Sequence, residues 1–411
     1  MTEETAVPVR PTRDRRQVWL TVAVTQLVLA VLTVGAVTLA YNTLNGNIEE
    51  GETINHQATK QRVAAADAGP MEPLNILILG SDSRAGDGND IDGLGDIGER
   101  ADTTILMHVS ADRRNAYGVS LPRDAIVDRP DCMDADGEMA AGEAQVMFNT
   151  AFSVGGAQCA VQTVESLTGI YIDHFLVVDF NGFKDMVEAI NGVEVCLPKE
   201  VNDPEHDIFL PAGVQTLTGQ DALNYVRERS ILSATGDIGR MKRQQAFIAS
   251  MINKVKSAGI LSQPLSIFNF LNAATSSIEV DADLDSVGKL ADLATQFRNT
   301  GLSDISFITV PIAEYPLDPN RLIWTEQADE LWARIMDDQQ LGKDFSATSI
   351  GADDSVGSID EPTETPTDEP SDEPTGEPTD APTTDEPTLD PDDQAAAEAR
   401  DQARLAAGLC T

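Results

Sequence analysis

Asn75-Ile-Leu-Ile-Leu-Gly80-Ser-Asp82-Ser-Arg84 is the stretch of sequence that decides the fold. Its apolar run, over residues 74–79, ends at Gly80 and predicts a buried β-strand. Two charged residues, Asp82 and Arg84, follow the strand directly. Because ligands of open α/β sheets bind just beyond the carboxyl ends of strands, the stretch predicts a central strand and one edge of a binding site.

Strand and helix patterns alternate along the chain around this stretch. Apolar runs predict further strands at 103–109, 116–121, 175–179, 193–197, 278–280 and 305–310. Helices are predicted at 157–167, 182–190, 218–227, 240–258 and 286–297, and 322–336 closes the domain. This alternation predicts an α/β fold, an α-β-α sandwich around a central mixed sheet.

The N-terminal region predicts a membrane span. Residues 18–40 carry no charge, and their length suits a spanning helix of about 20 residues better than the ~7–15 apolar residues of a signal peptide. Four arginines precede the span, and three glutamates follow it: Arg10, Arg13, Arg15, Arg16, Glu49, Glu50 and Glu52. Since basic residues stay inside, we expect a cytoplasmic segment 1–17, a plasma-membrane signal-anchor 18–41 and an extracytoplasmic remainder.

The rest of the chain divides by composition. Residues 42–72 are polar and read as a stalk, and 73–340 carry the folded domain. Residues 341–393 are rich in acidic residues, Pro and Thr and are predicted to be disordered, followed by a C-terminal segment 394–411. Lys and Arg number 28 against 68 Asp and Glu, a net charge of −40, which argues against nucleic-acid binding through a basic surface.

Four cysteines are present, and none forms a CxxC pair, so a zinc ribbon is improbable. An oxidising exterior permits disulfides. Cys132 and Cys159 flank one segment and form the first expected pair, which leaves Cys196 and Cys410 as the second. Free buried thiols at some of these positions remain the alternative.

Two other motifs point to different chemistries. Gly93-Leu-Gly-Asp-Ile-Gly98 matches the dinucleotide-binding pattern, but it neither follows a strand directly nor opens a helix. Ala151-Phe-Ser153-Val-Gly155 resembles a nucleophile elbow, but no clear strand leads into Ser153. We therefore set both aside.

Four separated segments combine arginine and carboxylate near strand ends or in loops. They contain Asp82 with Arg84, Arg100 with Asp102, Arg123 with Asp124, and the run from Arg227 and Arg229 to Asp237, Arg240 and Gln244. Arginine suits bidentate phosphate contacts, and magnesium takes one or two carboxylates together with phosphate oxygens. The segments thus suggest a pyrophosphate bridged by Mg²⁺. Ordinary salt bridges and solvated loops are the bland alternative for each segment taken singly.

In their order along the chain, these segments resemble the LytR-CpsA-Psr family of wall-polymer transferases, of actinobacterial type. The matching stretches include NILILGSDSR (75–84), RADTT (100–104), SLPRD (120–124), LTGQDALNYVRER (217–229) and DIGRMKRQQ (237–245). The resemblance covers about residues 73–340, which would then be the catalytic domain.

The resemblance implies an enzyme that moves a glycopolymer phosphate from a polyprenyl-pyrophosphate carrier to a peptidoglycan hydroxyl, leaving a phosphodiester link. Asp82 and Asp102 would be ligands of Mg²⁺, with Mn²⁺ as an alternative, and Arg123 would act with them in catalysis. The implied pyrophosphate clamp consists of Arg84, Arg100, Arg123, Arg227, Arg229, Arg240 and Gln244. Either Asp124 or Asp237 could be the general base.

The resemblance also implies an apolar groove for the polyprenyl tail. The candidates are Phe152, Phe175, Phe180 and Phe247, with Phe148, Phe183, Met186, Val187 and Met251 beside them; plain core packing is the alternative for each. The expected partners are a polyprenyl-pyrophosphate-linked glycan, the peptidoglycan acceptor and the membrane. Two other functions stay open: a pyrophosphatase acting on the same lipid, and a non-enzymatic wall-associated protein.

Overall fold

The computed structural model describes residues 15–60, 71–82, 100–134, 137–204, 208–229, 231–233, 235–257, 264–354, 356–357 and 400–411. Arg84 and residues 358–393 of the predicted tail lie outside this part of the chain, as do Gly93–Gly98.

A central sheet of eight strands organises the domain. Its spatial order is β1 (Glu49–Glu50), β14 (Ile278–Val280), β9 (His174–Val178), β2 (Leu74–Ser81), β3 (Ala101–Val109), β4 (Ala116–Ser120), β15 (Ile305–Thr309) and β18 (Ile350–Gly351). The pairs β1–β14, β2–β9 and β4–β15 are parallel and the others antiparallel, so the sheet is mixed, as predicted.

Strand β2 lies in the middle of this sheet because both of its faces are apolar. Leu77 and Leu79 belong to one hydrophobic cluster, while Ile76 and Ile78 pack in another on the opposite face. Successive side chains of a strand point to opposite faces, so an unbroken run such as Ile-Leu-Ile-Leu needs cover on both sides.

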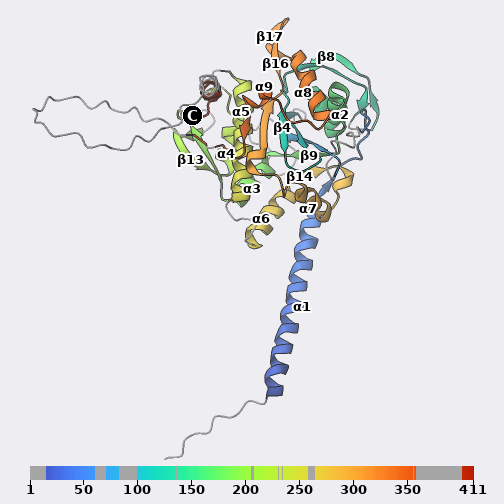
Figure 1. Ribbon diagram of the computed structural model, residues 1–411, viewed down its shortest axis with the longest axis vertical. Helices are drawn as coiled ribbons and strands as arrows, with labels where there is room; N and C mark the ends of the chain where they lie inside the picture. The colour runs from blue at the N-terminus through green and yellow to red at the C-terminus, as the bar shows by residue number, and fades with distance from the viewer. Residues whose placement is uncertain are drawn as a thin grey trace, which may run out of the picture.

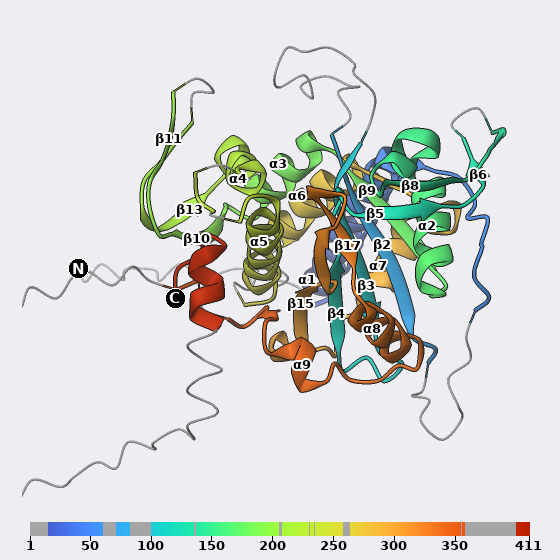
Figure 2. The same ribbon diagram turned by 90° about the horizontal axis from the view of Figure 1, so that it is seen from above.

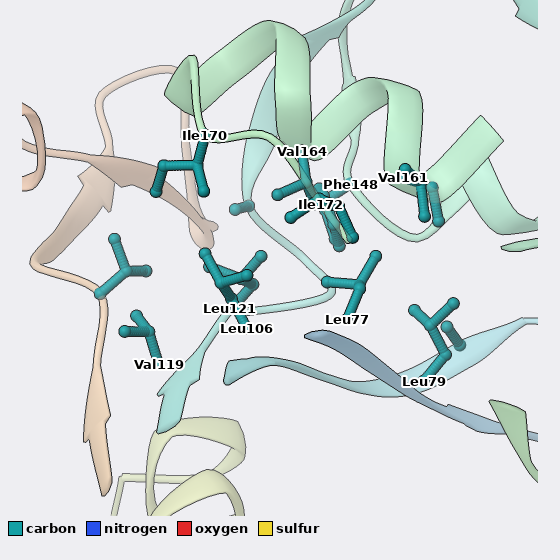
Figure 3. Packing of buried hydrophobic residues seen from close by; sticks show 14 of the residues in the cluster. Leu77, Leu79, Leu106, Val119, Leu121, Phe148, Val161, Val164, Ile170 and Ile172 are labelled. Atoms are coloured by element: carbon teal, nitrogen blue, oxygen red, sulfur yellow. The ribbon is translucent and has the colours of Figure 1, made fainter. Parts of the chain in front are cut away.

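Helices supply that cover and complete the predicted α-β-α sandwich (Figure 2). Helices α2 (Thr150–Thr168) and α8 (Glu326–Met336) pack on the Leu77 face, which we call the closed face. Figure 3 shows Val161 and Val164 of α2 above Leu77 and Leu79. Helices α5 (Asp237–Ser257) and α7 (Val287–Gln296) pack on the Ile76 face, which we call the open face.

A second core lies beside the open face. Its cluster joins α3 (Phe180–Ala189), α4 (Gly219–Arg227) and α5 to the hairpin of β10 (Val193–Leu197) and β13 (Gly213–Leu217). The predicted strand at 193–197 therefore exists but pairs outside the central sheet. The remaining hairpins are β11 (Val201–Asp203) with β12 (Ile208–Leu210), β5 (Ile126–Arg129) with β8 (Glu143–Met147), β6 (Cys132–Met133) with β7 (Met139–Ala140), and β16 (Ile312–Tyr315) with β17 (Asp318–Trp324).

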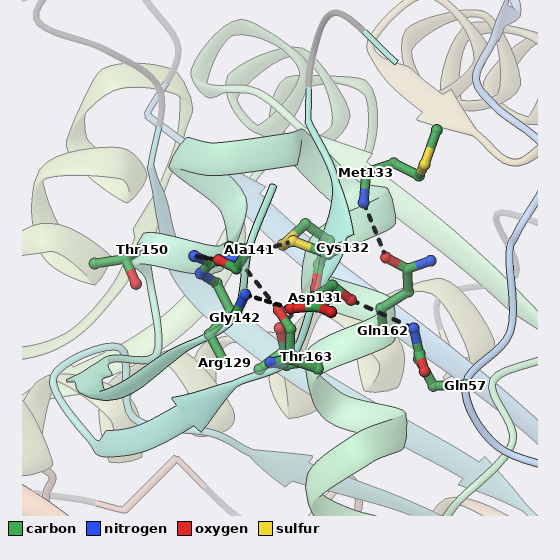
Figure 4. Close-up of a disulfide and its surroundings, with 12 residues drawn as sticks. Gln57, Arg129, Asp131, Cys132, Met133, Ala141, Gly142, Thr150, Gln162 and Thr163 are labelled. Carbon is green, nitrogen blue, oxygen red and sulfur yellow. Dashed lines mark hydrogen bonds between the residues drawn. A yellow bond between two sulfur atoms is a disulfide. The ribbon is translucent and has the colours of Figure 1, made fainter. Parts of the chain in front are cut away.

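Two disulfides are present, in the pairing that the sequence suggested. Cys132 of β6 is bonded to Cys159 of α2, with 5.2 Å between their Cα atoms. Figure 4 shows the hydrogen bonds around it, including Met133 N to Gln162 Oε1 at 3.3 Å. Cys196 of β10 is bonded to Cys410, 5.7 Å apart between Cα atoms, and this bond attaches the C-terminal segment to the second core.

Helix α1 (Arg15–Asn47) projects from the domain (Figure 1). Its most apolar 18-residue window has a mean hydropathy of 2.2, and none of that window is buried in the protein. By length and composition the helix is compatible with a single-pass membrane anchor.

The predicted stalk is wrong for residues 42–60. Residues up to Asn47 continue α1, and β1 then pairs directly with β14. Beyond β1, the backbone N–H groups of Gln57 and Ala58 donate to Glu165 Oε2 at 2.5 and 3.0 Å. The segment is polar, and some of its polar groups bond the domain surface.

The predicted tail also begins too early. Residues 341–354 contain α9 (Lys343–Ser346) and β18, which pairs with β15 at the sheet edge. Phe345 and Ile350 are buried, so this short segment holds enough apolar surface to order. A further helix, α6 (Pro264–Thr275), was not predicted at all.

Candidate functional site

The predicted site residues meet at one edge of the central sheet, where β2 and β4 end and the antiparallel β3 begins. Ser81 pairs with Ala101, which places Asp82 and Asp102 on neighbouring strand ends. Asp82 N donates to Arg100 O at 2.9 Å, and Arg100 N donates to Asp82 Oδ1 at 2.6 Å. Opposite strand directions thus bring together residues from separate sequence motifs.

Helix α5 supplies the other side of the site. Gln245 Nε2 donates to Ser120 Oγ at 2.9 Å and to Thr309 Oγ1 at 3.0 Å. These bonds hold the first turns of α5 over the ends of β4 and β15. As a result, Asp237 and Arg240, in the first turn of the helix, face the strand ends.

Two arginines and two aspartates form what we call the charged cluster: Asp102, Arg123, Asp237 and Arg240. Arg123 Nη1 donates to Asp102 Oδ1, and Arg123 Nη2 lies 3.5 Å from Asp237 Oδ1. Arg240 Nη2 lies 2.8 Å from the same Asp237 oxygen, and Arg240 Nη1 lies 3.9 Å from Asp102 Oδ2. Each arginine therefore contacts both carboxylates.

The two arginines of the charged cluster are largely buried. The side chain of Arg240 is 3% exposed and that of Arg123 14%. Burial alone would raise the pKa of Asp102, but the charges of Arg123 and Arg240 outweigh it and lower this pKa. For Arg123, burial is likewise outweighed, chiefly by Asp102 and Asp237, and its pKa is raised. The cluster thus holds Asp102 ionised and Arg123 protonated.

The charged cluster leaves hydrogen-bonding capacity unused. Within the described residues, the buried atoms Arg123 Nε, Arg240 Nε and both carboxylate oxygens of Asp237 make no hydrogen bond. Unmet buried donors and acceptors are costly unless a ligand or water meets them. Both signs are represented, so the cluster can take up an anion and a cation together.

Four other predicted residues lie around the cluster. Arg229 is near enough that its charge helps to lower the pKa of Asp102. The guanidinium carbon of Arg227 lies 4.6 Å from the centre of the Phe180 ring, a cation–π distance. Gln244 Nε2 donates to Val226 O at 3.1 Å. Arg100 is exposed at the rim of the site.

An apolar groove leads away from the charged cluster between α3 and α5. Its empty volume is about 980 Å³, including the part open to solvent, and Asp102, Arg227 and Arg240 line its polar end. Its walls are three side chains from each helix: Phe180, Phe183, Met186, Phe247, Ile248 and Met251. On α5, positions 240, 244, 247, 248 and 251 share one helix face, which changes from polar to apolar along the helix.

The structure divides the predicted lipid-pocket residues between two places. Phe180 and Phe247 line the groove, together with Phe183, Met186 and Met251. Phe152 and Phe175 are instead buried in the core of the closed face, as is Phe148, and Val187 is buried in the second core. The prediction is corrected here because aromatic content alone does not reveal which face of the sheet a residue occupies.

One charged neighbour was missed from the sequence. Arg321 of β17 places Nη1 3.0 Å from Asp124 Oδ1, and Asp124 Oδ2 lies 3.5 Å from Arg123 Nε. Arg321 stands far from the other motifs in the chain, and only the folding back of the β16–β17 hairpin brings it near. It extends the alternation of positive and negative charge outward from the charged cluster.

Comparison with known proteins places this geometry in context. The family model described as LytR_cpsA_psr matches residues 38–339. Two curated relatives come from Corynebacterium glutamicum: cell wall biosynthesis protein LcpA, 34% identical over 262 residues (58% of this chain, 50% of the relative), and probable cell wall biosynthesis protein LcpB, 35% identical over 264 residues (62% and 59%).

A third relative is the Bacillus subtilis polyisoprenyl-teichoic acid–peptidoglycan teichoic acid transferase TagT, 30% identical over 239 residues (56% of this chain, 67% of the relative). The matched region therefore spans about half the length of LcpA and somewhat more of LcpB and TagT.

Solved structures share the fold. A Streptococcus agalactiae protein aligns with a TM-score of 0.53 and 23% identity, covering 66% of this chain and 90% of that one. A LytR-Csp2A-Psr enzyme from Actinomyces oris aligns with a TM-score of 0.50 and 21% identity (69% and 96%). At these identities the likeness shows the fold alone.

Proposed function

The chain belongs to the LytR-CpsA-Psr family, and we propose that it transfers a glycopolymer phosphate from a polyprenyl-pyrophosphate carrier to a hydroxyl of peptidoglycan. The observation that carries the proposal is the charged cluster at the head of an apolar groove. One end suits a pyrophosphate and the other an isoprenoid chain, so one site offers a place for both parts of the carrier. The names of LcpA and TagT, which refer to cell-wall biosynthesis and to transfer onto peptidoglycan, support the same conclusion.

The reaction is a phosphoryl transfer. The acceptor oxygen bonds to the phosphorus that carries the glycan, the bond from that phosphorus to the bridging oxygen breaks, and polyprenyl phosphate leaves. Arg123 and Arg240 are placed to neutralise charge on the phosphate oxygens, since fixed guanidinium groups stabilise developing charge without reorganising. Asp237 is our candidate to accept the hydroxyl proton. Its Oδ1 is paired with Arg240, but its buried Oδ2 makes no hydrogen bond within the described residues, whereas both oxygens of Asp124 lie near an arginine.

Asp82 and Asp102 are the residues proposed to hold Mg²⁺, or Mn²⁺ in its place. Their chemistry fits: Asp102 stays ionised, and the two carboxylates stand on neighbouring strand ends. Among the described residues no cluster of three or more His, Cys, Asp or Glu side chains could hold a metal. A magnesium site completed by phosphate oxygens needs only one or two carboxylates. The ion would neutralise phosphate charge.

Localisation follows from the anchor. Arg15 and Arg16 open α1, with Arg10 and Arg13 before them, while acidic residues follow its end. By the positive-inside rule we propose a single pass through the plasma membrane with the domain on the extracytoplasmic side. This is where a polyprenyl carrier, which cannot leave the bilayer, would present its glycan to peptidoglycan.

The test is product analysis with the full-length protein, a polyprenyl-pyrophosphate-linked glycan and peptidoglycan. We expect glycan joined to peptidoglycan through a phosphodiester, and Arg123→Ala should lower this rate by about a thousandfold or more. Arg334→Ala is the matched control, because Arg334 pairs with Glu330 on the surface of α8, at 2.9 Å. Unlinked glycan phosphate as the product would instead indicate a pyrophosphatase, and full activity of folded Arg123→Ala would refute the proposal.

A further inference from the structure

Helix α6, the helix that the sequence did not predict, lies on the underside of the domain beside the upper end of α1 (Figure 1). Its sequence, PLSIFNFLNAAT, contains no charged residue. Leu271 is 37% exposed, and Ile267, Phe268 and Phe270 are partly buried. An uncharged surface helix that exposes a leucine and only partly buries three more apolar side chains requires an explanation, because a helix at the surface of a soluble domain normally carries a polar outer face.

Direct contacts join α6 to the end of α1. Asn47 Nδ2 donates to Asn272 Oδ1 at 3.0 Å and to Thr275 Oγ1 at 3.4 Å. Helical spacing places Phe268 and Leu271 on the same face as these two residues, one turn nearer the helix start. Leu44 of α1 is also buried against the domain, at 5% exposed. The anchor and α6 therefore form one packed unit.

The aromatic residues of α1 locate the expected bilayer surface. Trp19 and Tyr41 are 74% and 48% exposed at the two ends of the apolar stretch. At 1.5 Å per residue they are about 33 Å apart, close to the ~30 Å thickness of the hydrocarbon core, and such residues favour both membrane interfaces. Asn47 lies about 9 Å beyond Tyr41 on the same scale, within or just above the headgroup layer. Its partner α6 must lie at the same depth.

The inner side of α6 is continuous with the groove. Phe270 packs against the second core, as do Phe180 and Phe183, two of the groove's wall residues. Helix α6 thus has the groove wall on one side and the membrane anchor on the other. Among the described helices, α7 also approaches α1, through a hydrogen bond that Val287 N donates to Asn45 Oδ1 at 3.2 Å, but it does not line the groove.

We propose that α6 is an interfacial membrane helix, with the Phe268–Leu271 face inserted among the lipid headgroups and upper acyl chains beside α1. The bilayer covers its exposed apolar side, as it does for amphipathic helices that lie in the interface. The isoprenoid chain of the substrate then passes from the acyl layer along α6 into the groove. This second step rests on the proposed function, while insertion of α6 rests only on α1 spanning the membrane.

Insertion can be measured without any activity. The full-length protein is labelled with an environment-sensitive nitrobenzoxadiazole fluorophore at Leu271→Cys and placed in phosphatidylglycerol vesicles with and without brominated acyl chains. Leu317→Cys is the matched control, because Leu317 is 80% exposed in the β16–β17 turn at the opposite pole of the domain (Figure 1). We expect blue-shifted emission and at least twofold quenching at position 271 only. A label at 271 that behaves like the label at 317 would overturn the proposal.

A second pair of variants tests the route into the groove. Leu271→Asp should lower transfer about tenfold with a long-chain carrier embedded in vesicles, since removing a leucine from an apolar environment is worth about one decade. It should leave transfer unchanged with a short-chain, water-soluble carrier, and Leu317→Asp should change neither. Equal loss on both carriers, or loss on neither, would contradict the route. If the wild type shows no transfer, the proposed function fails, while the labelling experiment still decides whether α6 is inserted.

Discussion

The two faces of the central sheet are both lined by apolar residues, but only one of them leaves a groove. On the closed face, α2 and α8 seal the sheet with a continuous core that includes Phe175, 1% exposed, and a disulfide fastens α2 from outside. On the open face, α3 and α5 stand apart over part of the sheet and leave a groove of about 980 Å³. The difference indicates that one face is used for stability and the other for binding.

Truncating one phenylalanine on each face should separate these roles most sharply. Phe175→Ala is expected to destabilise the protein by about 3–5 kcal/mol, because it opens a cavity in a sealed core. Phe180→Ala should cost only about 1 kcal/mol, the scale of its contact with Arg227, but should weaken carrier binding. Chemical denaturation of the protein measures the change in stability, and titration with the carrier measures the change in binding. Equal destabilisation by the two substitutions would contradict the assignment of stability to one face and binding to the other.

Removing the disulfide of the closed face should have the next largest effect. Cys132→Ser combined with Cys159→Ser releases a loop of 27 residues and is expected to cost about 2–4 kcal/mol. Both sulfurs lie outside the groove and the charged cluster, so the rate of transfer at a temperature where the protein stays folded should not change. A lowered rate in the folded variant would show that the closed face contributes to the site.

Enlarging one side chain on each face also tests whether the closed face serves stability and the open face serves binding. Val164→Phe overfills the core under α2 and should destabilise the protein by about 1–3 kcal/mol. Met251→Trp projects into the groove and should change stability little while competing with the isoprenoid chain. Thermal unfolding and the KM for long-chain against short-chain carriers are the measurements. Unchanged long-chain KM in Met251→Trp would mean that the chain binds elsewhere.

The smallest expected effect concerns pH. The pKa of Asp102 is held below its ordinary value of 3.8, so its ion pairs contribute stability above about pH 4 that is lost as the pH falls through the lowered pKa. Stability measured between pH 5 and pH 2 should therefore decline less steeply in Asp102→Asn than in the wild type. Parallel curves of stability against pH for the two proteins would indicate that the arginine neighbours do not lower the pKa of Asp102.

The same comparison explains how much the sequence could predict. Strand β2 and the site edge followed from Ile76–Leu79 and Asp82, because an apolar run and the residues after it are local features. The phenylalanines could not be assigned to a face, since Phe175 and Phe180 differ only in the direction that the sheet and α3 give them. The face that a side chain occupies depends on the tertiary structure.

Two segments were assigned wrongly for a related reason. Residues 42–60 and 341–354 are polar or mixed, which suggested a stalk and a tail, yet they contribute the two edge strands of the sheet, β1 and β18. Edge pairing depends on the backbone hydrogen bonds that a neighbouring strand offers, and composition does not reveal them. Helix α6 was missed because it contains no charged residue and only a few polar ones, so its helical period is weakly marked in the sequence.

A structure of the protein with a short-chain polyprenyl pyrophosphate and Mg²⁺ tests the central claim most directly. The account predicts that the pyrophosphate lies between Arg123 and Arg240, with the metal against Asp82 and Asp102, and that the chain follows the groove past Phe180 to Met251. A pyrophosphate bound away from these arginines, or a chain lying outside the groove, would contradict it.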